Sequence, residues 1–458
     1  MRRWLGLACG TVLLIAAPTA ASAQLRTCDL VQEADFRRLV NARSETVFYF
    51  RDPVRLRCTG GVTLAADSAV YNQSQLSTEL VGDVVYRDST TQLTSDWANY
   101  QGNLEQLLAR GDVVLTDLRN GSVATGQELQ YLRRSATRAT SHSVLRGIRP
   151  RAVLRGSGEA ARPAAADTAA PLEVTADRLE FIGDTLFLAL GNVDLERGGT
   201  TGAADAARYH QTGERLTLTG NAHVRDARYR LEGERIDALV EGETLREVIA
   251  ERNTRLISDE LTVESERLHI GFVDGALDRL QAWNPAPPSS GGALPDDGPP
   301  PERAFVLAEG FRLRADSIDA VADSGALREV RAVHRAYGER RLDSLTASLP
   351  TLVARDWIQG DTIIGYFTSS ESTVETDSTE VVLDRVVVIG GSAPALSLYR
   401  TEPETDGERG AINFMKASRI ILFLTEGDVA RVEAEGPVDG LYLDPVVTRP
   451  TPDGGSGV

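Results

Sequence analysis

Residues 177–195 read DRLEFIGDTLFLALGNVDL and contain one complete copy of the pattern on which the fold is built. It opens on a polar residue, Asp177, and apolar residues follow two and four positions later, at Leu179 and Phe181. Apolar residues at every second position are typical of a half-buried β-strand, whereas a helix has a period of about 3.6 residues. Gly191-Asn192 then interrupts a second apolar run, and both residue types tolerate the positive φ angles of turns and bulges. The stretch therefore predicts a strand, a short turn and a second strand that is bent by a glycine.

The same pattern recurs along the chain. Nine polar anchors are each followed by apolar residues at the second and fourth positions: Asp67, Asp96, Gln127, Asp177, Asp205, Glu234, Glu266, Asp316 and Ser418. The first eight anchors follow one another at intervals of 29, 31, 50, 28, 29, 32 and 50 residues, which sets a unit of about 30 residues. In four units a glycine dipeptide comes 14 or 15 residues after the anchor, at Gly82-Asp83, Gly111-Asp112, Gly191-Asn192 and Gly220-Asn221. Because strands with one apolar face must bury it, we predict an all-β fold of antiparallel strands stacked into a sandwich or a jelly-roll tube.

Two linker-like stretches divide the units into three clusters. The predicted order is a signal peptide at 1–23, an N-terminal segment at 24–57, a jelly-roll segment at 58–146, a linker at 147–171, a second jelly-roll segment at 172–283, a Pro/Gly-rich linker at 284–303, a third jelly-roll segment at 304–446 and a disordered tail at 447–458. One short amphipathic helix is expected at 29–42, with Leu30, Val31 and Leu39 on its apolar face.

The first 23 residues predict export. Arg2 and Arg3 precede an apolar stretch at 5–17, and small residues at 21–23 form a cleavage site. Removal of this segment leaves two cysteines, Cys28 and Cys58. Two cysteines in an exported chain favour one disulfide, which would contribute roughly 3–4 kcal/mol, although two unpaired thiols are the alternative.

Charge and residue spacing exclude several functions. Lys and Arg number 49 against 66 Asp and Glu, and the net charge of −17 argues against binding to nucleic acid. The five histidines lie far apart and show no metal-ligand spacing. The repeated aspartates are expected to cap turns and not to bind cations, because their period does not match that of calcium-binding rolls. No pair of carboxylates is marked as catalytic, so we expect no enzyme, no metal and no cofactor.

The units resemble the organic-solvent-tolerance-like family. The resemblance rests on an Ala-Asp pair at the start of a strand, as in Ala66-Asp67 and Ala176-Asp177, on an aromatic residue four positions later, and on the following Gly-Asp or Gly-Asn. Residues 413–428 look like the closing unit of longer members. The family includes the periplasmic bridge protein of lipopolysaccharide transport and the periplasmic domain of the outer-membrane lipopolysaccharide translocon. This chain is longer than the bridge protein and has two interruptions.

The resemblance implies an open-ended β-jelly-roll tube, in two or three stacked segments, whose apolar interior shields lipid acyl chains. It implies a place in the periplasm, in association with the outer membrane. The implied partners are lipopolysaccharide or a related glycolipid, the outer-membrane translocon, and other jelly-roll proteins that pair with it through their edge strands. The alternative is a structural or adhesive β-repeat protein of the cell envelope that transfers no lipid.

The residues expected to line a lipid groove come from two neighbouring units. They are Phe181, Leu188, Leu190, Val193, Leu195, Tyr209, Leu216 and Leu218. The alternation predicts that Leu188 and Val193 point inward and that Asp194 and Glu196 point to solvent. The aromatic residues have a second interpretation as ordinary core packing. Each CH₂ removed from water contributes about 0.8 kcal/mol, so buried acyl chains would suffice for capture.

Overall fold

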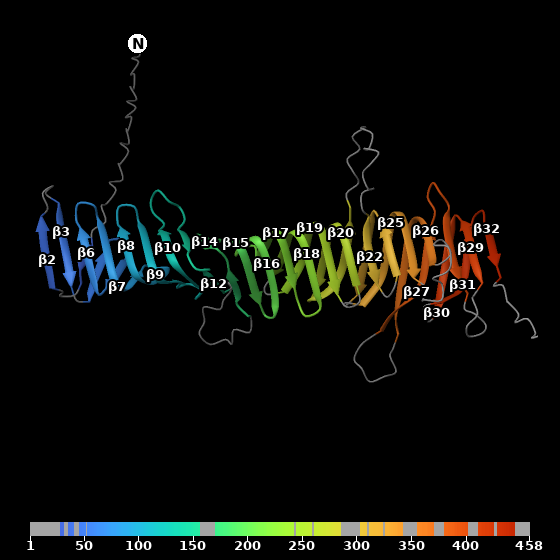
Figure 1. Cartoon of the computed structure of the whole chain (residues 1–458), viewed down its shortest axis with the longest axis horizontal. Coiled ribbons are helices and arrows are strands. Elements are labelled where there is room, and N and C mark those ends of the chain that lie inside the picture. Colours follow the sequence, from blue (N-terminus) through green and yellow to red (C-terminus); the bar gives the residue numbers. More distant parts are fainter. Residues whose placement is uncertain are drawn as a thin grey trace, which may run out of the picture.

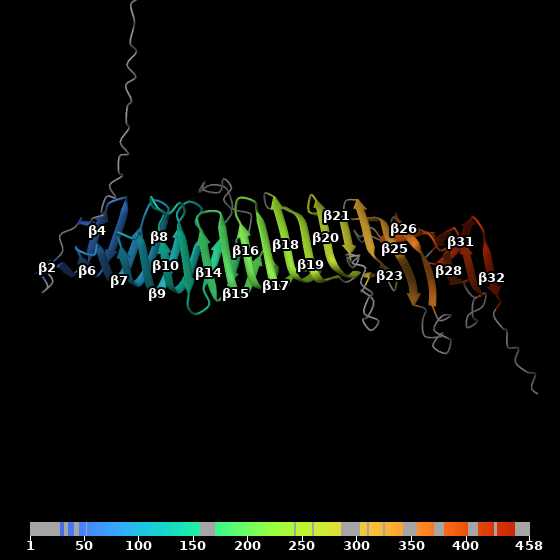
Figure 2. The same ribbon diagram turned by 90° about the horizontal axis from the view of Figure 1, so that it is seen from above.

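The computed structural model describes residues 28–31, 35–40, 45–51, 53–155, 170–241, 244–258, 261–284, 303–308, 311–323, 326–341, 355–370, 380–401, 411–425 and 428–444. Within these ranges every element is a β-strand and none is a helix. The strands follow one another along the long axis of an elongated molecule (Figure 1 and Figure 2). The prediction of an all-β jelly-roll fold is confirmed.

The strands form three runs. The first consists of β1 (Cys28–Leu30), β2 (Asp35–Val40), β3 (Thr46–Arg51), β4 (Val54–Cys58), β5 (Val62–Ala66), β6 (Ser68–Asn72), β7 (Ser77–Arg87), β8 (Thr91–Gln101), β9 (Gln106–Asp117), β10 (Val123–Leu132), β11 (His142–Arg146) and β12 (Arg151–Leu154). The second consists of β13 (Leu172–Thr175), β14 (Arg178–Ile182), β15 (Leu186–Arg197), β16 (Thr200–His210), β17 (Arg215–Arg225), β18 (Tyr229–Glu241), β19 (Thr244–Ser258), β20 (Leu261–Val273) and β21 (Ala276–Trp283). The third consists of β22 (Ala304–Ala308), β23 (Phe311–Ala315), β24 (Ser317–Asp323), β25 (Ala326–Arg341), β26 (Arg355–Ser370), β27 (Glu380–Ile389), β28 (Ala395–Arg400), β29 (Ile412–Ala417), β30 (Arg419–Thr425), β31 (Asp428–Glu435) and β32 (Asp439–Leu443).

Each long strand belongs to two sheets. Residues 77–81 of β7 pair with β6, whereas residues 85–87 pair with β5. In the same way β15 pairs with β14 through residues 186–190 and with β13 through residues 194–196. We call the layer that contains β6, β11 and β14 the first sheet, and the layer that contains β5, β12 and β13 the second sheet. The two sheets enclose one hydrophobic core.

A bulge with two left-handed residues lets a strand pass from one sheet to the other. Gly191 has φ +77° and Asn192 has φ +46°, and the pairing of β15 with β16 shifts register there. The anchor Asp177 lies against this bulge. Its backbone N–H donates to the carbonyl of Gly191 at 2.9 Å, and its Oδ2 accepts from Nδ2 of Asn192 at 2.8 Å. The recurring aspartates are therefore structural partners of the bulge.

Two later bulges have no glycine. Left-handed residues stand at Arg252-Asn253 and at His334-Arg335. Here the anchors are joined to the bulge by ion pairs, Glu234 with Arg252 at 3.0 Å and Asp316 with Arg335. The charged side chains hold a backbone conformation that costs about 1–2 kcal/mol for each residue other than glycine.

Cross-strand pairing aligns the repeat into continuous inward-facing rows. The inner row consists of the residue two positions after each anchor and the residues that pair with it on neighbouring strands. None of its members is more than 3% exposed: Ala69, Leu80, Ala98, Ala109, Leu129, Leu145, Leu179, Ala189, Ala207, Leu218, Ile236, Ala250, Leu268, Ala282, Ile318, Ala332, Ile363, Val388 and Ile420. The rim row lies nearer the hairpin turns and consists of the residue four positions after an anchor and its cross-strand partners: Tyr71, Thr78, Tyr100, Leu107, Tyr131, Ser143, Phe181, Phe187, Tyr209, Leu216 and Ala238. The facing row lies on the second sheet: Leu64, Tyr86, Leu93, Leu115, Ala124, Ala152, Val174, Leu195, Gly202, Val224 and Leu231.

The N-terminal part differs from the expectation of a helix at 29–42. The residues described there form β1 and β2, and the helix prediction is wrong. The Phe36 ring of β2 packs against the rings of Phe48 and Phe50, at centroid distances of 6.3 and 6.0 Å, so aromatic contacts favour pairing with β3. Cys28 lies opposite Cys58 in the pairing of β1 with β4, and the two form a disulfide.

The ladder of strands continues past both predicted linkers. Residues 151–154, inside the linker predicted at 147–171, form β12 and pair with β10 and β13, so that prediction is wrong for this part. Strands before and after the second predicted linker, 284–303, also pair with each other: β20 with β22, and β21 with β24. The predicted signal peptide and the tail at 447–458 lie outside the described residues. No helix in the part described is long and apolar enough to cross a membrane.

Replacing Gly191 with alanine should destabilise the bulge. A Cβ there would lie 2.5 Å from Oδ2 of Asp177, in addition to the strain of a positive φ. Gly199 is the matched control, because its φ is +87° and nothing lies within 4 Å of a Cβ built on it. We expect Gly199→Ala to cost about 1–2 kcal/mol and Gly191→Ala clearly more, measured by thermal unfolding. Equal losses would show that Asp177 does not constrain the bulge.

Candidate functional site

The candidate site is the apolar interior between the two sheets. Six of the eight residues expected to line a groove belong to the hydrophobic core or pack against it: Phe181, Val193, Leu195, Tyr209, Leu216 and Leu218. Asp194 and Glu196 are exposed, as the alternation predicts. These six residues therefore lie in or against the core, and their contact with lipid stays a prediction.

Leu188, which was predicted to point inward, and Leu190, which was expected to line the groove, do not lie on the buried face of β15. Both alternate with the buried Phe187 and Ala189, and Leu190 is 36% exposed. Every residue from 186 to 190 is apolar, so the sequence of this run does not determine which residues face inward. Tertiary pairing decides it, because Phe187 stands opposite Phe181 on one side and Tyr209 on the other.

Tyrosine rings fill the interior of the first run. Tyr86 of the facing row lies between Tyr100 and Tyr131 of the rim row, with ring centroids 6.0 and 5.7 Å away. The three residues are only 1%, 1% and 3% exposed. This tyrosine plug joins the two sheets and leaves no open apolar surface between them at this point.

A buried carboxylate closes the plug. Oδ2 of Asp88 accepts hydrogen bonds from the hydroxyls of Tyr86 at 2.9 Å and of Tyr131 at 3.0 Å, and its side chain is 1% exposed. Oδ1 accepts from the backbone N–H groups of Thr90 and Thr91, both at 2.9 Å. Burial, reinforced by the Asp88 charge, raises the pKa of both tyrosines, so both phenols stay protonated as donors. Nε of Arg133 adds an ion pair at 3.4 Å.

The second run leaves its interior partly open. Phe181, Tyr209 and Leu216 of the rim row pack against the core but keep exposed surface. Four residues after the bulge glycine, where the first run has Tyr86, β17 has the smaller Val224. Gly202 in the same facing row has no side chain, and Leu195 fills the space beside it, since a Cβ built on Gly202 would lie 2.6 Å from Cδ1 of Leu195. The difference in side-chain volume separates a filled half from an open half.

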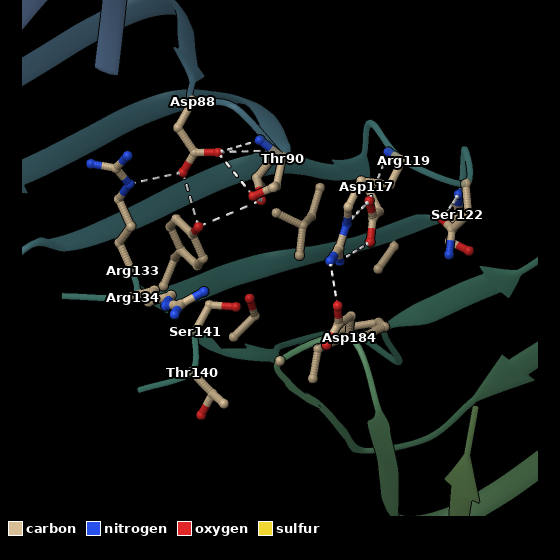
Figure 3. A pocket seen from close by; sticks show the side chains of 18 of the residues that line it. Asp88, Thr90, Asp117, Arg119, Ser122, Arg133, Arg134, Thr140, Ser141 and Asp184 are labelled. Atoms are coloured by element: carbon tan, nitrogen blue, oxygen red, sulfur yellow. Dashed lines mark hydrogen bonds and ion pairs between the residues drawn. The ribbon is translucent and has the colours of Figure 1, made fainter. Parts of the chain in front are cut away.

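A pocket of about 430 Å³ lies where the two halves meet. It opens between turns of the second sheet, which carry Asp88 and Arg119, and turns of the first sheet, which carry Arg134 and Asp184 (Figure 3). Its apolar lining includes Leu115, Ala124, Leu154 and Phe181. The volume falls in the range of about 300–1,000 Å³ that is typical of ligand sites, but polar side chains outnumber apolar ones in the lining.

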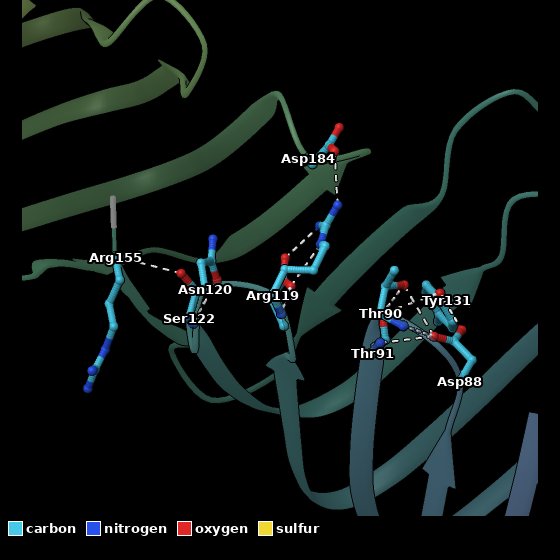
Figure 4. Close-up of polar contacts among 10 residues, drawn as sticks. Asp88, Thr90, Thr91, Arg119, Asn120, Ser122, Tyr131, Arg155 and Asp184 are labelled. Atoms are coloured by element: carbon cyan, nitrogen blue, oxygen red, sulfur yellow. Dashed lines mark hydrogen bonds and ion pairs between the residues drawn. The ribbon is translucent and has the colours of Figure 1, made fainter. Parts of the chain in front are cut away.

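An ion pair spans the mouth of this pocket. Nη1 of Arg119 lies 2.9 Å from Oδ2 of Asp184, and the same guanidinium holds Asp117 at 2.6 Å (Figure 4 shows the contact with Asp184). These contacts raise the pKa of Arg119, chiefly through its hydrogen bond to Asp117, so the guanidinium stays charged. No group of three or more His, Cys, Asp or Glu side chains suited to a metal ion occurs among the described residues.

The plug and the ion pair were not found by sequence reasoning. Asp88, Arg119 and Asp184 lie in hairpin turns, where charged residues are common. The one available signal was Tyr86, because the other units place aliphatic residues at that distance from their glycine: Leu115, Leu195 and Val224.

Comparisons with known proteins give limited guidance. No protein-family model and no curated protein matches the chain. Among solved structures, it is similar to LptH from Pseudomonas aeruginosa, described as the LptA homologous periplasmic component of the conserved lipopolysaccharide transport device. The identity is 13%, the match covers 35% of this chain and 82% of LptH, and the TM-score is 0.19, so this likeness supports no functional argument.

Removing the Asp88 carboxylate should destabilise the first run. In Asp88→Ala the hydroxyls of Tyr86 and Tyr131 lose their acceptor inside the core, which should cost about 3 kcal/mol. Asp226 is the matched control. Its backbone N–H donates to the carbonyl of Tyr229, just as that of Asp88 donates to the carbonyl of Thr91, but Asp226 is only half-buried. Asp226→Ala should cost about 1 kcal/mol or less, measured by urea unfolding. Similar losses for the two variants would contradict the assigned role of Asp88.

Proposed function

We propose that this chain is a periplasmic lipid-binding protein of the lipopolysaccharide transport type. Its open half shields the acyl chains of a glycolipid and helps to move that glycolipid to the outer membrane. The observation that supports this proposal most directly is that Phe181, Tyr209 and Leu216 of the rim row pack against the core and yet keep exposed apolar surface. Each CH₂ that such a surface removes from water contributes about 0.8 kcal/mol, and no reacting group is needed.

The proposed partners follow from the ends of the ladder. Among the described strands, β2 pairs with β3 alone and β32 with β29 alone, so each keeps one unpaired edge. Phe36 and Leu39 on β2 are 52% and 56% exposed, and Leu441 on β32 is 55% exposed. Exposed apolar edge strands favour pairing with a further strand. We propose other jelly-roll proteins and the outer-membrane translocon as the partners at these edges.

A structural or adhesive role in the cell envelope is the second candidate. The observation in its favour is the filled first run, where the tyrosine plug needs no ligand to complete its packing. This role gives no reason for the partly exposed apolar residues inside the second run. The lipid-binding role accounts for both halves.

A photo-crosslinker at Tyr209 should capture lipid. Benzoylphenylalanine in place of Tyr209 keeps an aromatic ring in the rim row, and we expect it to form an adduct with purified lipopolysaccharide on irradiation. Arg208 is the matched control, because it is the next residue on β16 and points to solvent. We expect benzoylphenylalanine at Arg208 to give at least about tenfold less adduct, detected by mass shift, since a solvent-facing position lies outside the apolar interior. Equal adducts at both positions, or none at either, would favour the structural role.

A further inference from the structure

The pocket at the junction of the two halves has two different sides. Towards the first run its wall is formed by Tyr131 and Asp88, which are 3% and 6% exposed. Towards the second run it includes Phe181, whose ring lies 5.0 Å from that of Phe187 in the rim row. The partly exposed Tyr209 and Leu216 follow along the same row. An alkyl chain that enters this pocket therefore has apolar surface ahead of it in one direction only.

The pocket is lined by three carboxylates and three arginines, which are equal in number but unevenly paired. Arg119 holds both Asp117 and Asp184. Asp88 is occupied by two tyrosine hydroxyls and two backbone N–H groups, besides Arg133. All three carboxylates thus have partners inside the pocket. The charged groups that still have free hydrogen-bond donors for an anion are arginines.

Two neighbouring arginines, Arg133 and Arg134, have N–H donors without a partner among the described residues. Nη1 of Arg133 is buried and has no hydrogen-bond partner in the part of the chain described, while Nη2 donates to the carbonyl of Gly60 at 2.7 Å. Arg134 lines the pocket, and no ion pair or hydrogen bond joins its side chain to another described residue (Figure 3). A guanidinium offers several N–H donors in a fixed plane that suits phosphate and carboxylate groups.

From this geometry we infer that the pocket is a lateral portal for an anionic amphiphile. The headgroup binds the exposed Arg134 at the mouth, next to Arg133, whose Nη1 is buried, and the alkyl chain extends past Phe181 along the rim row of β15 to β17. The tyrosine plug stops the chain from extending into the first run. This inference rests on the proposed lipid binding and adds an entry point, a direction and a headgroup charge to it.

The test compares two probes that have the same alkyl chain. Dodecyl phosphate and dodecanol, each with a diazirine at the terminal carbon, differ only in the charged group. We expect dodecyl phosphate to bind the full-length protein more tightly than dodecanol does. Arg134→Gln should weaken phosphate binding about fivefold, in line with about 1 kcal/mol for an exposed ion pair, and should leave the alcohol unchanged. Arg208→Gln is the control, because Arg208 is exposed on the outer face of β16.

Each outcome separates the portal from lipid binding as such. If the wild-type chain binds neither probe, the proposed function fails together with the portal. If both probes bind with equal affinity and Arg134→Gln changes neither, lipid binding stands and the portal is wrong. Displacement of the phosphate probe by inorganic phosphate at equal concentration would show a simple anion site and would also overturn the portal.

The diazirine reports the direction of the chain without any substitution in the protein. After irradiation of the wild-type complex with dodecyl phosphate, peptide mass spectrometry should find the label within residues 178–225. Labels within β7 to β9 would show that the chain passes the tyrosine plug, and this result would overturn the inferred direction.

Discussion

The structure depends on one constraint, which is that each long strand must bend at its middle without losing its inward face. Two successive left-handed residues supply the bend, and an anchor from the preceding strand holds them. At Gly191 the anchor Asp177 lies so close that only a residue without a Cβ fits. At Arg252 and Arg335 ion pairs take over this role. Because the bend recurs at the same place in successive strands, the two sheets stay in register along the molecule.

That register turns a weak sequence repeat into continuous apolar rows. The inner row is buried along its whole length, so it forms a constant base for the tube. The rim row and the facing row vary, and their side chains decide whether the space between the sheets is filled or open. Tyr86 and Tyr131 fill it in the first run, whereas in the second run Val224 stands where Tyr86 would be and Tyr209 and Leu216 keep exposed surface. One scaffold thus carries a closed half and an open half.

The closed half also shows why a polar group belongs in this interior. Phenols bring hydroxyls into the core, and buried hydroxyls need acceptors. Asp88 accepts from two of them and from the backbone of its own turn. A carboxylate at a hairpin turn therefore links the two sheets. In the open half the equivalent Asp226 accepts from Thr200 at 3.3 Å and makes no such link between the sheets.

The fold class, the unit of about 30 residues and the four bends that contain glycine were predictable from the sequence, because alternation and glycine dipeptides are local signals. The bends at Arg252 and His334 have no glycine and gave no such signal. The sequence also placed Val193, Leu195 and Leu218 in the core. The tertiary structure decided the rest. Which face of the all-apolar run 186–190 points inward depends on the pairing of Phe187 with Phe181 and Tyr209, and the strands in place of a helix at 29–42 depend on partners elsewhere in the chain. The plug joins Asp88 to Tyr131, 43 residues later, and the pocket joins the turns of Arg119 and Asp184, 65 residues apart. Contacts between such distant residues leave no periodic trace in a sequence.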